Sequence, residues 1–240
     1  MTGTVHVCWS TRSAEGSPVD WLDQTERERF DGLRQLEDRR VFLASRKLLK
    51  TVVGHLADTP AQMVRLSYDC PGCARSHGRP LVVAPHAAVR WHVSLSHSGR
   101  HVMVAATEAG PVGVDVETTA ATVFEGFDLV ALTCAERTEV EHCAPAAQAR
   151  ARAVYWVRKE AVLKATGHGL SVDPAALEVT APHLPAALTA WHGAELLPTQ
   201  VQITDILVDQ EHVAAVAVLA QARCDVVLEP RPGSSCGQDG

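Results

Sequence analysis

The sequence WVRKEAVLKATGHGL, residues 156–170, combines a largely apolar helical pattern with charged side chains near its end. Glu160 and Lys164 are four residues apart, so they share one face of the predicted helix. Gly167 follows the last apolar position, where a glycine in the left-handed conformation commonly ends a helix. Taken alone, the Glu–Lys pair is either an ordinary helix-stabilising pair or an acid and a cation placed side by side in a site.

A second stretch, GVDVE at residues 113–117, alternates valines with carboxylates. In a β-strand, Asp115 and Glu117 project from one face while Val114 and Val116 bury the other. Because like charges on neighbouring positions repel, a cation is expected between them. The stretch is therefore either a solvated strand end or half of a magnesium site, since Mg²⁺ commonly takes one or two carboxylates together with substrate phosphates.

The wider pattern predicts an α+β protein of two similar halves in one chain. In the first half, strands are expected at 5–9, 64–69, 91–97 and 101–108, with helical sequence at 21–56. In the second, helices are expected at 127–143 and 147–166, followed by strands at 176–181, 187–192, 201–208, 212–220 and 225–229. We expect halves at residues 1–111 and 112–229, and a disordered Pro/Gly/Ser-rich tail at 230–240.

Composition narrows the functional class. The net charge of −6 disfavours nonspecific nucleic-acid binding, although basic residues concentrate between Arg27 and Lys50. The most apolar segment, residues 212–222, is too short to span a bilayer, so no membrane association is expected. The first residues show no secretory pattern, and the seven cysteines lack the spacing of a disulfide scaffold, so a cytoplasmic location is expected.

GVDVE and WVRKEAVLKATGHGL resemble the two signatures of 4′-phosphopantetheinyl transferases, Gly-Val/Ile-Asp-Val/Ile-Glu and Trp-x-x-Lys-Glu-Ala-x-x-Lys-x-x-Gly-x-Gly-Leu, at every fixed position. Four shorter elements resemble family elements in the same order: FLASRKLLK (42–50), HGRPLV (77–82), VSLSHSG (93–99) and LTCAE (132–136), the last preceding the carrier-contacting helix. The length and two-half layout resemble the single-chain, surfactin-synthetase-activating type, which is a pseudo-dimer of two α+β halves.

The resemblance implies transfer of the phosphopantetheine arm of coenzyme A to a serine of an acyl or peptidyl carrier protein, with release of adenosine 3′,5′-bisphosphate. Asp115, Glu117 and Glu160 would hold Mg²⁺, with Mn²⁺ as the alternative. Lys164 would neutralise pyrophosphate charge, and Glu160 would accept the serine proton. A monomer is expected.

The resemblance also implies a basic pocket for the nucleotide phosphates, built by Arg46, Arg79 and His97, with Ser96 as a hydroxyl donor. Arg34, Arg39 and Lys50 are further contributors to consider, and Arg79 stands where the family commonly has lysine. The sequence CPGCARSH places Cys70, Cys73 and His77 either in a zinc site or in a turn.

Two rival functions stay open at this level. A noncatalytic relative would bind coenzyme A or a carrier without turnover, but it would be expected to lack one of the acids or Lys164. A magnesium phosphoesterase would use the same acids to hydrolyse a coenzyme A or nucleotide substrate without any carrier.

Overall fold

The computed structural model describes residues 2–11, 19–69, 76–193 and 200–229. The predicted tail at 230–240 and the cysteines Cys70 and Cys73 lie outside the described residues. Within the described part, no helix is both long enough and apolar enough to cross a membrane.

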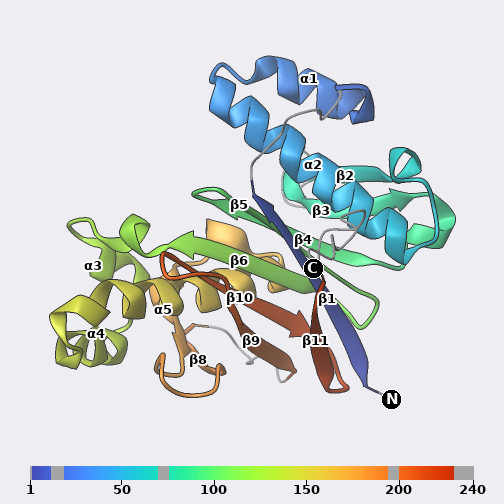
Figure 1. Cartoon of the computed structure of the whole chain (residues 1–240). Helices are drawn as coiled ribbons and strands as arrows, with labels where there is room; N and C mark the ends of the chain where they lie inside the picture. The colour runs from blue at the N-terminus through green and yellow to red at the C-terminus, as the bar shows by residue number, and fades with distance from the viewer. Residues whose placement is uncertain (1, 12–18, 70–75, 194–199, 230–240) are drawn as a thin grey trace, which may run out of the picture.

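A six-stranded sheet with the order β11-β1-β5-β4-β3-β2 forms the larger half (Figure 1). Its strands are β1 (Gly3–Thr11), β2 (Arg65–Asp69), β3 (Ser76–Ala84), β4 (His92–Ser98), β5 (His101–Thr107) and β11 (Cys224–Glu229). Helix α1 (Gln24–Gly32) leads into α2 (Leu36–Leu56), and α2 lies across one face of this sheet. Strand β11 pairs in parallel with β1, so the last described strand of the chain completes the sheet that the first strand begins.

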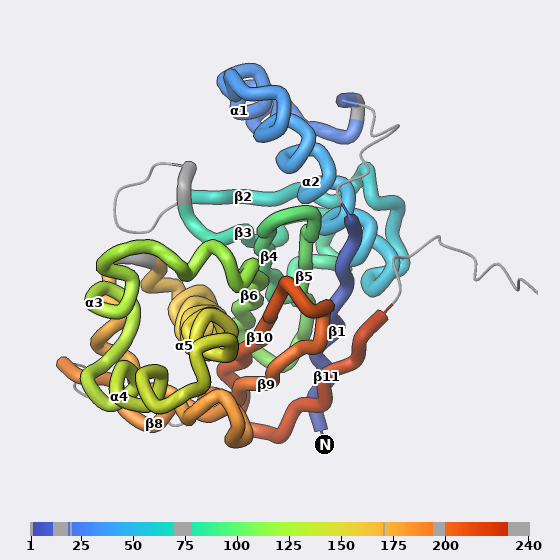
Figure 2. The backbone as a smooth tube through the Cα atoms, turned by 60° about the vertical axis from the view of Figure 1, so that its left-hand side comes forward, coloured from blue at the N-terminus to red at the C-terminus, as the bar shows by residue number. Residues whose placement is uncertain are grey.

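The smaller half is an antiparallel sheet with the order β6-β10-β9, covered by one long helix. The strands are β6 (Val112–Thr118), β9 (Val201–Leu207) and β10 (His212–Leu219), and the helix is α5 (Pro145–Thr166). Figure 2 shows α5 nearly end-on against β6 and β10. Beside them lie α3 (Phe127–Ala131), α4 (Cys134–His142) and the hairpin of β7 (Leu177–Val179) with β8 (Leu188–Trp191).

Short 3₁₀ helices connect these elements at Val19–Trp21, Ala61–Met63, His86–Ala88, Thr119–Thr122, Gly169–Ser171 and Pro174–Ala176.

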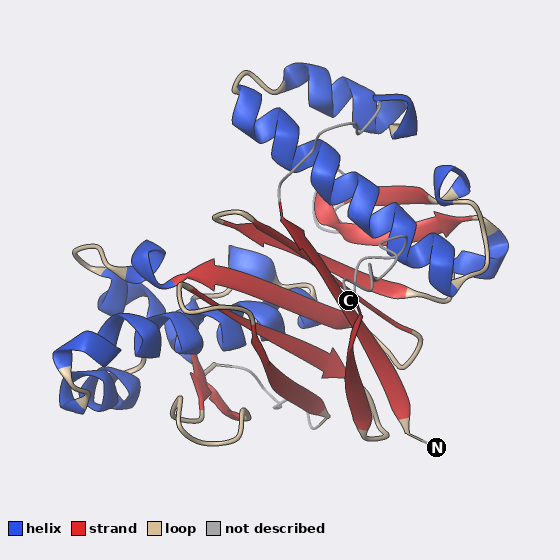
Figure 3. Cartoon of the chain, in the orientation of Figure 1, coloured by secondary structure: helices blue, strands red, loops and turns tan. Residues whose placement is uncertain are grey.

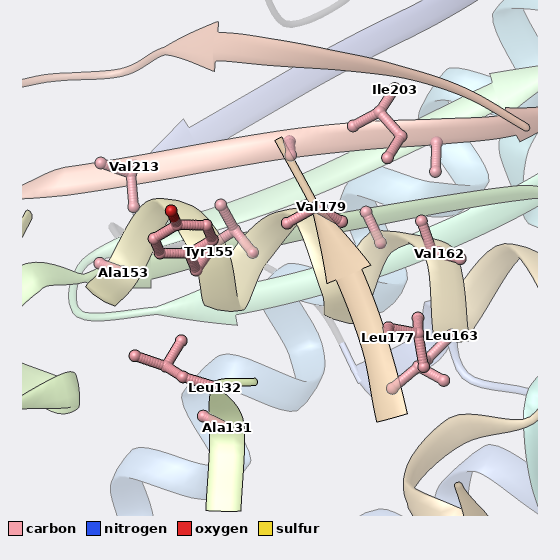
Figure 4. Packing of buried hydrophobic residues seen from close by; sticks show 14 of the residues in the cluster. Ala131, Leu132, Ala153, Tyr155, Val162, Leu163, Leu177, Val179, Ile203 and Val213 are labelled. Atoms are coloured by element: carbon pink, nitrogen blue, oxygen red, sulfur yellow. The ribbon is translucent and has the colours of Figure 1, made fainter. Parts of the chain in front are cut away.

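Three buried clusters hold the layers together in the order helix, sheet, sheet, helix (Figure 3). Leu48, Leu49 and Val52 of α2 pack on the large sheet. On the other side of the molecule, α5 buries residues such as Tyr155 and Val162 against the small sheet, β7 and the Ala131–Leu132 segment (Figure 4). The third cluster lies between the two sheets and is formed by Val5, Val7, Met103, Ala105, Val112, Val114, Val116, Ile206, Ala214, Val216, Val218 and Ala220.

The predicted α+β class and the two-half layout are confirmed, although the halves carry sheets of unequal size. The helix expected at 21–56 is two helices, because Asp23 caps α1 and Leu33 adopts an extended conformation after Gly32. The helix expected at 127–143 is likewise divided, since Leu132 is extended and Thr133 caps α4. Strand β3 was not predicted. The division between residues 111 and 112 stays a prediction.

Gly113 allows α5 to lie directly on β6. A Cβ atom at this position would lie 2.0 Å from the carbonyl oxygen of Ala161 and 2.5 Å from the nitrogen of Ala165. Both neighbours are backbone atoms of the helix, so they cannot turn aside as a side chain can. Asp115 and Glu117 lie on the same face of β6 as Gly113, and the close contact therefore brings both acids beside α5.

We expect Gly113→Ala to destabilise the protein by about 3 kcal/mol or more, at or above the upper end for overpacked sites, because α5 must move off β6. Gly32→Ala is the matched control, since nothing lies within 4 Å of its added Cβ, and it should change stability by less than about 1 kcal/mol. Urea unfolding of both variants measures the difference, and equal stabilities would contradict the packing argument.

Candidate active site

The seam between strands β4 and β6 brings the predicted acidic residues into one place. Strand β6 is an edge strand of the small sheet, so its outward backbone N–H groups need partners other than β10. Serine hydroxyls of β4 accept them, in the pairs Val114–Ser94 at 3.0 Å, Val116–Ser96 at 3.3 Å and Thr118–Ser98 at 3.3 Å. In a β-strand, side chains and backbone N–H groups alternate in direction from one residue to the next. Three serines on one face of β4 therefore match three successive outward N–H groups of β6.

Asp115 lies in this seam and is paired with the helix lysine. Its side chain is buried, and Oδ1 accepts hydrogen bonds from Ser96 Oγ at 2.7 Å and Lys164 Nζ at 2.6 Å. The ammonium group also donates to the carbonyl oxygen of Val114 at 3.1 Å. Asp115 Oδ2 is buried and has no hydrogen-bond partner among the described residues.

Glu160 faces the same point from helix α5. Its carboxylate is buried, and Oε1 has no hydrogen-bond partner within the described part of the chain. Burial raises the pKa of Glu160, the nearby charge of Asp115 raises it further, and Lys164 opposes both effects. Asp115 and Lys164 both act on the charge of Glu160 and are paired with each other, so the three side chains form one charged group.

Glu117 is on the same face of β6 but has different partners. Its Oε1 accepts the backbone N–H of Thr118 at 2.7 Å and the hydroxyl of Ser98. The three predicted acids do not bring their ligand atoms within 4.8 Å of one another, whereas another group among the described residues, treated below, does. For Glu117 to join Asp115 and Glu160 on one ion, its carboxylate must turn away from Ser98.

The donor set nevertheless fits a hard divalent cation. Asp115 Oδ2 and Glu160 Oε1 are buried carboxylate oxygens without partners among the described residues, and such atoms normally bind hydrogen-bond donors, water or an ion. Oxygen ligands from one or two carboxylates, with room for phosphate oxygens, are typical of Mg²⁺ sites.

The predicted phosphate-binding residues occupy more than one place. Arg46 and His97 line the same surface hollow, of about 350 Å³, between α2 and β4. Arg46 is buried, lies 4.4 Å from the ring centre of Phe42 and 4.5 Å from that of Tyr68, and is 3.6 Å from Glu26. It is thus held rigidly, by stacking and by charge.

Arg79 and Ser96 lie outside this hollow. Arg79 is exposed and donates to the carbonyl oxygen of Ala165 at 3.3 Å, so it links β3 to the last turn of α5. Ser96 points the opposite way from His97, into the β4–β6 seam against Asp115. Of the further basic residues, Lys50 is fully buried and pairs with Glu26 at 2.5 Å, so it supports the Arg46 region from inside. Arg39 binds the carbonyl oxygen of Leu33 at 2.8 Å.

Comparison with known proteins gives a consistent answer for both halves. Residues 8–109 match the model of the 4′-phosphopantetheinyl transferase N-terminal domain, and residues 111–217 match that of the 4′-phosphopantetheinyl transferase superfamily. The 4′-phosphopantetheinyl transferase HetI of Nostoc sp. (strain PCC 7120) is 30% identical over 190 residues, covering 76% of this chain and 72% of the relative. The chain belongs to the 4′-phosphopantetheinyl transferase superfamily. It is therefore an enzyme that uses coenzyme A and transfers phosphopantetheine to carrier proteins.

A buried ion pair in this transferase was missed by the sequence reasoning. Lys159, directly before Glu160, is fully buried and donates to Glu136 Oε2 at 2.5 Å and to the carbonyl oxygen of Ala131 at 2.7 Å. Glu136 also accepts the N–H groups of Thr133 at 2.8 Å and Val179 at 3.1 Å. The signal was present in the sequence, because Thr-x-x-Glu at residues 133–136 is a capping box.

Arg158 of α5, like Lys159, is a buried cation that holds neighbouring elements to the helix. It is fully buried, pairs with Asp205 of β9 at 2.6 Å and donates to backbone carbonyls at 180, 181 and 184. The signature segment of the transferase thus contains two buried cations that hold neighbouring elements. It also contains Lys164, one turn beyond Glu160, which pairs with Asp115.

Replacing each of the two signature lysines, Lys159 and Lys164, should lower the free energy of unfolding by different amounts. We expect Lys159→Met to cost about 3–5 kcal/mol, because it leaves the buried Glu136 charge unpaired. Lys164→Met should cost clearly less in the metal-free protein, since the Lys164 side chain is 27% exposed and Asp115 keeps its bond from Ser96. Denaturant unfolding tests this, and adding Glu136→Gln to Lys159→Met should restore part of the loss. Equal costs at both lysines would contradict the assignment.

The raised pKa of Glu160 predicts a pH effect on the metal-free protein. Because its folded-state pKa lies above the ordinary 4.5, the folded state holds the proton more tightly, and this stability is present at low pH. It is lost as the pH rises through the folded pKa, by about 1.4 kcal/mol for each unit of elevation. Unfolding in EDTA should show wild type losing stability relative to Glu160→Gln as the pH rises above 4.5. A constant or opposite difference would contradict the pKa direction.

Proposed function

We propose that this enzyme is a single-chain transferase of the surfactin-synthetase-activating type, acting as a monomer with its halves divided after residue 111. It moves phosphopantetheine from coenzyme A onto a serine of an acyl or peptidyl carrier protein and releases adenosine 3′,5′-bisphosphate. The presence of both family regions in one chain supports this proposal, as does the helix-on-sheet layer in each half.

The observation that carries the proposal is the contact of Lys164 Nζ with Asp115 Oδ1 at 2.6 Å, beside two carboxylate oxygens that no described residue contacts by a hydrogen bond. Asp115 and Glu160 would hold Mg²⁺, or Mn²⁺ in its place, with Glu117 joining after release from Ser98. When bound, the ion supplies positive charge that neutralises the pyrophosphate of coenzyme A.

Lys164 and Glu160 supply the chemistry of the chain itself. The partly exposed ammonium of Lys164 can contact the pyrophosphate and stabilise the charge that develops on the leaving phosphate. Glu160, whose pKa is raised by burial, accepts the proton of the carrier serine, directly or through water. The serine oxygen bonds to the phosphorus that carries pantetheine, and the P–O bond to adenosine 3′,5′-bisphosphate breaks.

The nucleotide end would lie over the first half. Arg46 and His97 share a hollow, and a guanidinium held between two aromatic rings is a preformed partner for a phosphate. Arg79 and Ser96 are proposed as additional contacts, Arg79 from the end of α5 and Ser96 from the seam.

The carrier would dock beyond the end of β6. The segment from Val123 to Val130 exposes apolar side chains, with Val123 63%, Phe124 58% and Leu129 69% exposed. Apolar side chains exposed to this extent in one short segment are typical of an interaction surface. The segment directly follows the strand of Asp115 and Glu117, so a carrier bound there would have its serine near the acids.

Intact-protein mass of an apo carrier domain incubated with enzyme, coenzyme A and Mg²⁺ tests the proposal. We expect a mass gain of one phosphopantetheine on the carrier serine, and loss of this gain in EDTA. Hydrolysis of coenzyme A without carrier modification would favour a phosphoesterase. Coenzyme A binding without modification of any acyl or peptidyl carrier would favour a noncatalytic protein.

Glu160→Gln and Asp115→Ala should each abolish transfer while leaving the protein folded by circular dichroism. Asp225→Asn, an exposed acid on β11 of the larger sheet, is the matched control and should retain wild-type turnover. Wild-type turnover in either site variant would remove the assignment of the acids.

A further inference from the structure

Two histidines and an aspartate form a cluster outside the acidic group. His101 begins β5, His212 begins β10, and Asp209 lies in the turn between β9 and β10. The two histidines thus come from different sheets, and His212 is opposite Thr118 at the end of β6. The His–Asp–His cluster, as we name His101, Asp209 and His212, therefore joins the two halves.

The distances within the cluster suit a shared ion. His101 Nε2 lies 3.0 Å from Asp209 Oδ2, and His212 Nδ1 lies 2.8 Å from Asp209 Oδ1. One ligand atom from each residue falls within 4.8 Å of the other two. Metal–ligand bonds of about 2.0 Å in a tetrahedron separate the ligand atoms by about 3.3 Å, so modest side-chain shifts would complete the geometry.

Hydrogen bonding leaves both imidazoles half satisfied. His101 is 5% exposed and His212 is 2% exposed, and their rings are 4.5 Å apart between centres. The second ring nitrogens, His101 Nδ1 and His212 Nε2, are buried without a hydrogen-bond partner among the described residues. Arg100 Nε also lies 3.5 Å from His101 Nε2, so each imidazole uses one ring nitrogen within the cluster and leaves the other without a partner in the described part of the chain. A buried ring nitrogen without a partner calls for an explanation.

Backbone hydrogen bonds hold the carboxylate of Asp209 in place. Its Oδ1 accepts the backbone N–H groups of Glu211 at 2.9 Å and His212 at 2.8 Å, which fix the carboxylate from behind. His212 Nδ1, His101 Nε2 and Arg100 Nη2 all lie within hydrogen-bond distance of the carboxylate, at 2.8, 3.0 and 3.1 Å. Arg100 binds Oδ2 at 3.1 Å, but its side chain is 63% exposed and can move into solvent when a cation arrives.

We propose that His101, Asp209 and His212 bind a divalent transition-metal ion of the zinc class, at a site separate from Asp115 and Glu160. Imidazole nitrogens with one carboxylate select zinc, cobalt or nickel over Mg²⁺, which prefers oxygen ligands alone. Three protein ligands leave at least one coordination position for water.

The bound ion would act as a clamp between the sheets. His101 is opposite Ser98 across the β4–β5 turn, and His212 is opposite Thr118, whose N–H binds Ser98. A metal at the cluster would therefore fix the end of the seam where Glu117 lies.

Cobalt titration of the metal-depleted, full-length protein tests the proposal, because bound Co²⁺ absorbs visible light. We expect one Co²⁺ per chain, no thiolate charge-transfer band, displacement by Zn²⁺ but not by excess Mg²⁺, and a higher midpoint of thermal unfolding. His212→Asn and Asp209→Asn should each weaken Co²⁺ binding by about 100-fold or more.

Three controls locate the ion. Binding should persist in Asp115→Ala, in His142→Asn, which changes an exposed histidine, and in the double variant Cys70→Ser/Cys73→Ser. If His212→Asn does not fold by circular dichroism, His101→Asn replaces it. No Co²⁺ binding by wild type would overturn the proposal and leave a hydrogen-bonded His–Asp–His bridge. Binding that survives in the cluster variants, or is lost in the cysteine variant, would also overturn it.

Discussion

The unpaired edge of β6 is the constraint on which the rest of the structure depends. An edge strand that is largely buried against a second sheet must find acceptors for its outward N–H groups, because burial limits their contact with water. Ser94, Ser96 and Ser98 provide these acceptors at the strand repeat, and two of the same hydroxyls then donate to Asp115 and Glu117. One row of side chains thus fixes the register between the halves and the orientation of the acids. Moving β4 by one residue would replace the serines with Val93, Leu95 and His97 and lose both functions.

Helix α5 shows how burial decides what a charged side chain does. Arg158 and Lys159 are fully buried and bond to charged partners and backbone carbonyls. Arg158 thereby attaches β9 to the helix, and Lys159 attaches α4 and the Ala131 segment. Lys164, on the same helix, is only partly buried and shares its charge with one carboxylate. Glu160 is the opposite case, since its buried Oε1 has no hydrogen-bond partner among the described residues, and burial together with the charge of Asp115 raises its pKa. A buried charge without a partner is destabilising, and such groups are retained where function requires them.

Periodicity in the sequence predicted the local features that depend on neighbours along the chain. The alternation in GVDVE gave the strand and its shared acidic face, and Gly167 indeed ends α5 with φ of 78°. The break at Leu33 was not predicted, because the apolar pattern continues through residues 33–36. Pairings between distant segments could not be predicted. Nothing in Arg79 indicates that it meets Ala165, and the pattern of residues 225–229 does not show that this strand returns to β1. Such contacts depend on how the two halves pack together, and the hydrophobic periodicity of a single sequence carries no information about that packing.

The position of Glu117 follows from competition along the seam. Its carboxylate lies on the same strand face as that of Asp115, but it accepts hydrogen bonds from Thr118 N–H and Ser98 instead of a lysine. Asp115 accepts hydrogen bonds from a lysine and a serine on Oδ1, while its Oδ2 has no partner among the described residues. A cation bound at Asp115 and Glu160 would meet two oxygens that have no partner in the described part of the chain, whereas the Glu117 oxygen would first have to leave two hydrogen bonds. In the metal site that we propose, Asp115 would therefore be the fixed ligand and Glu117 the one that must move.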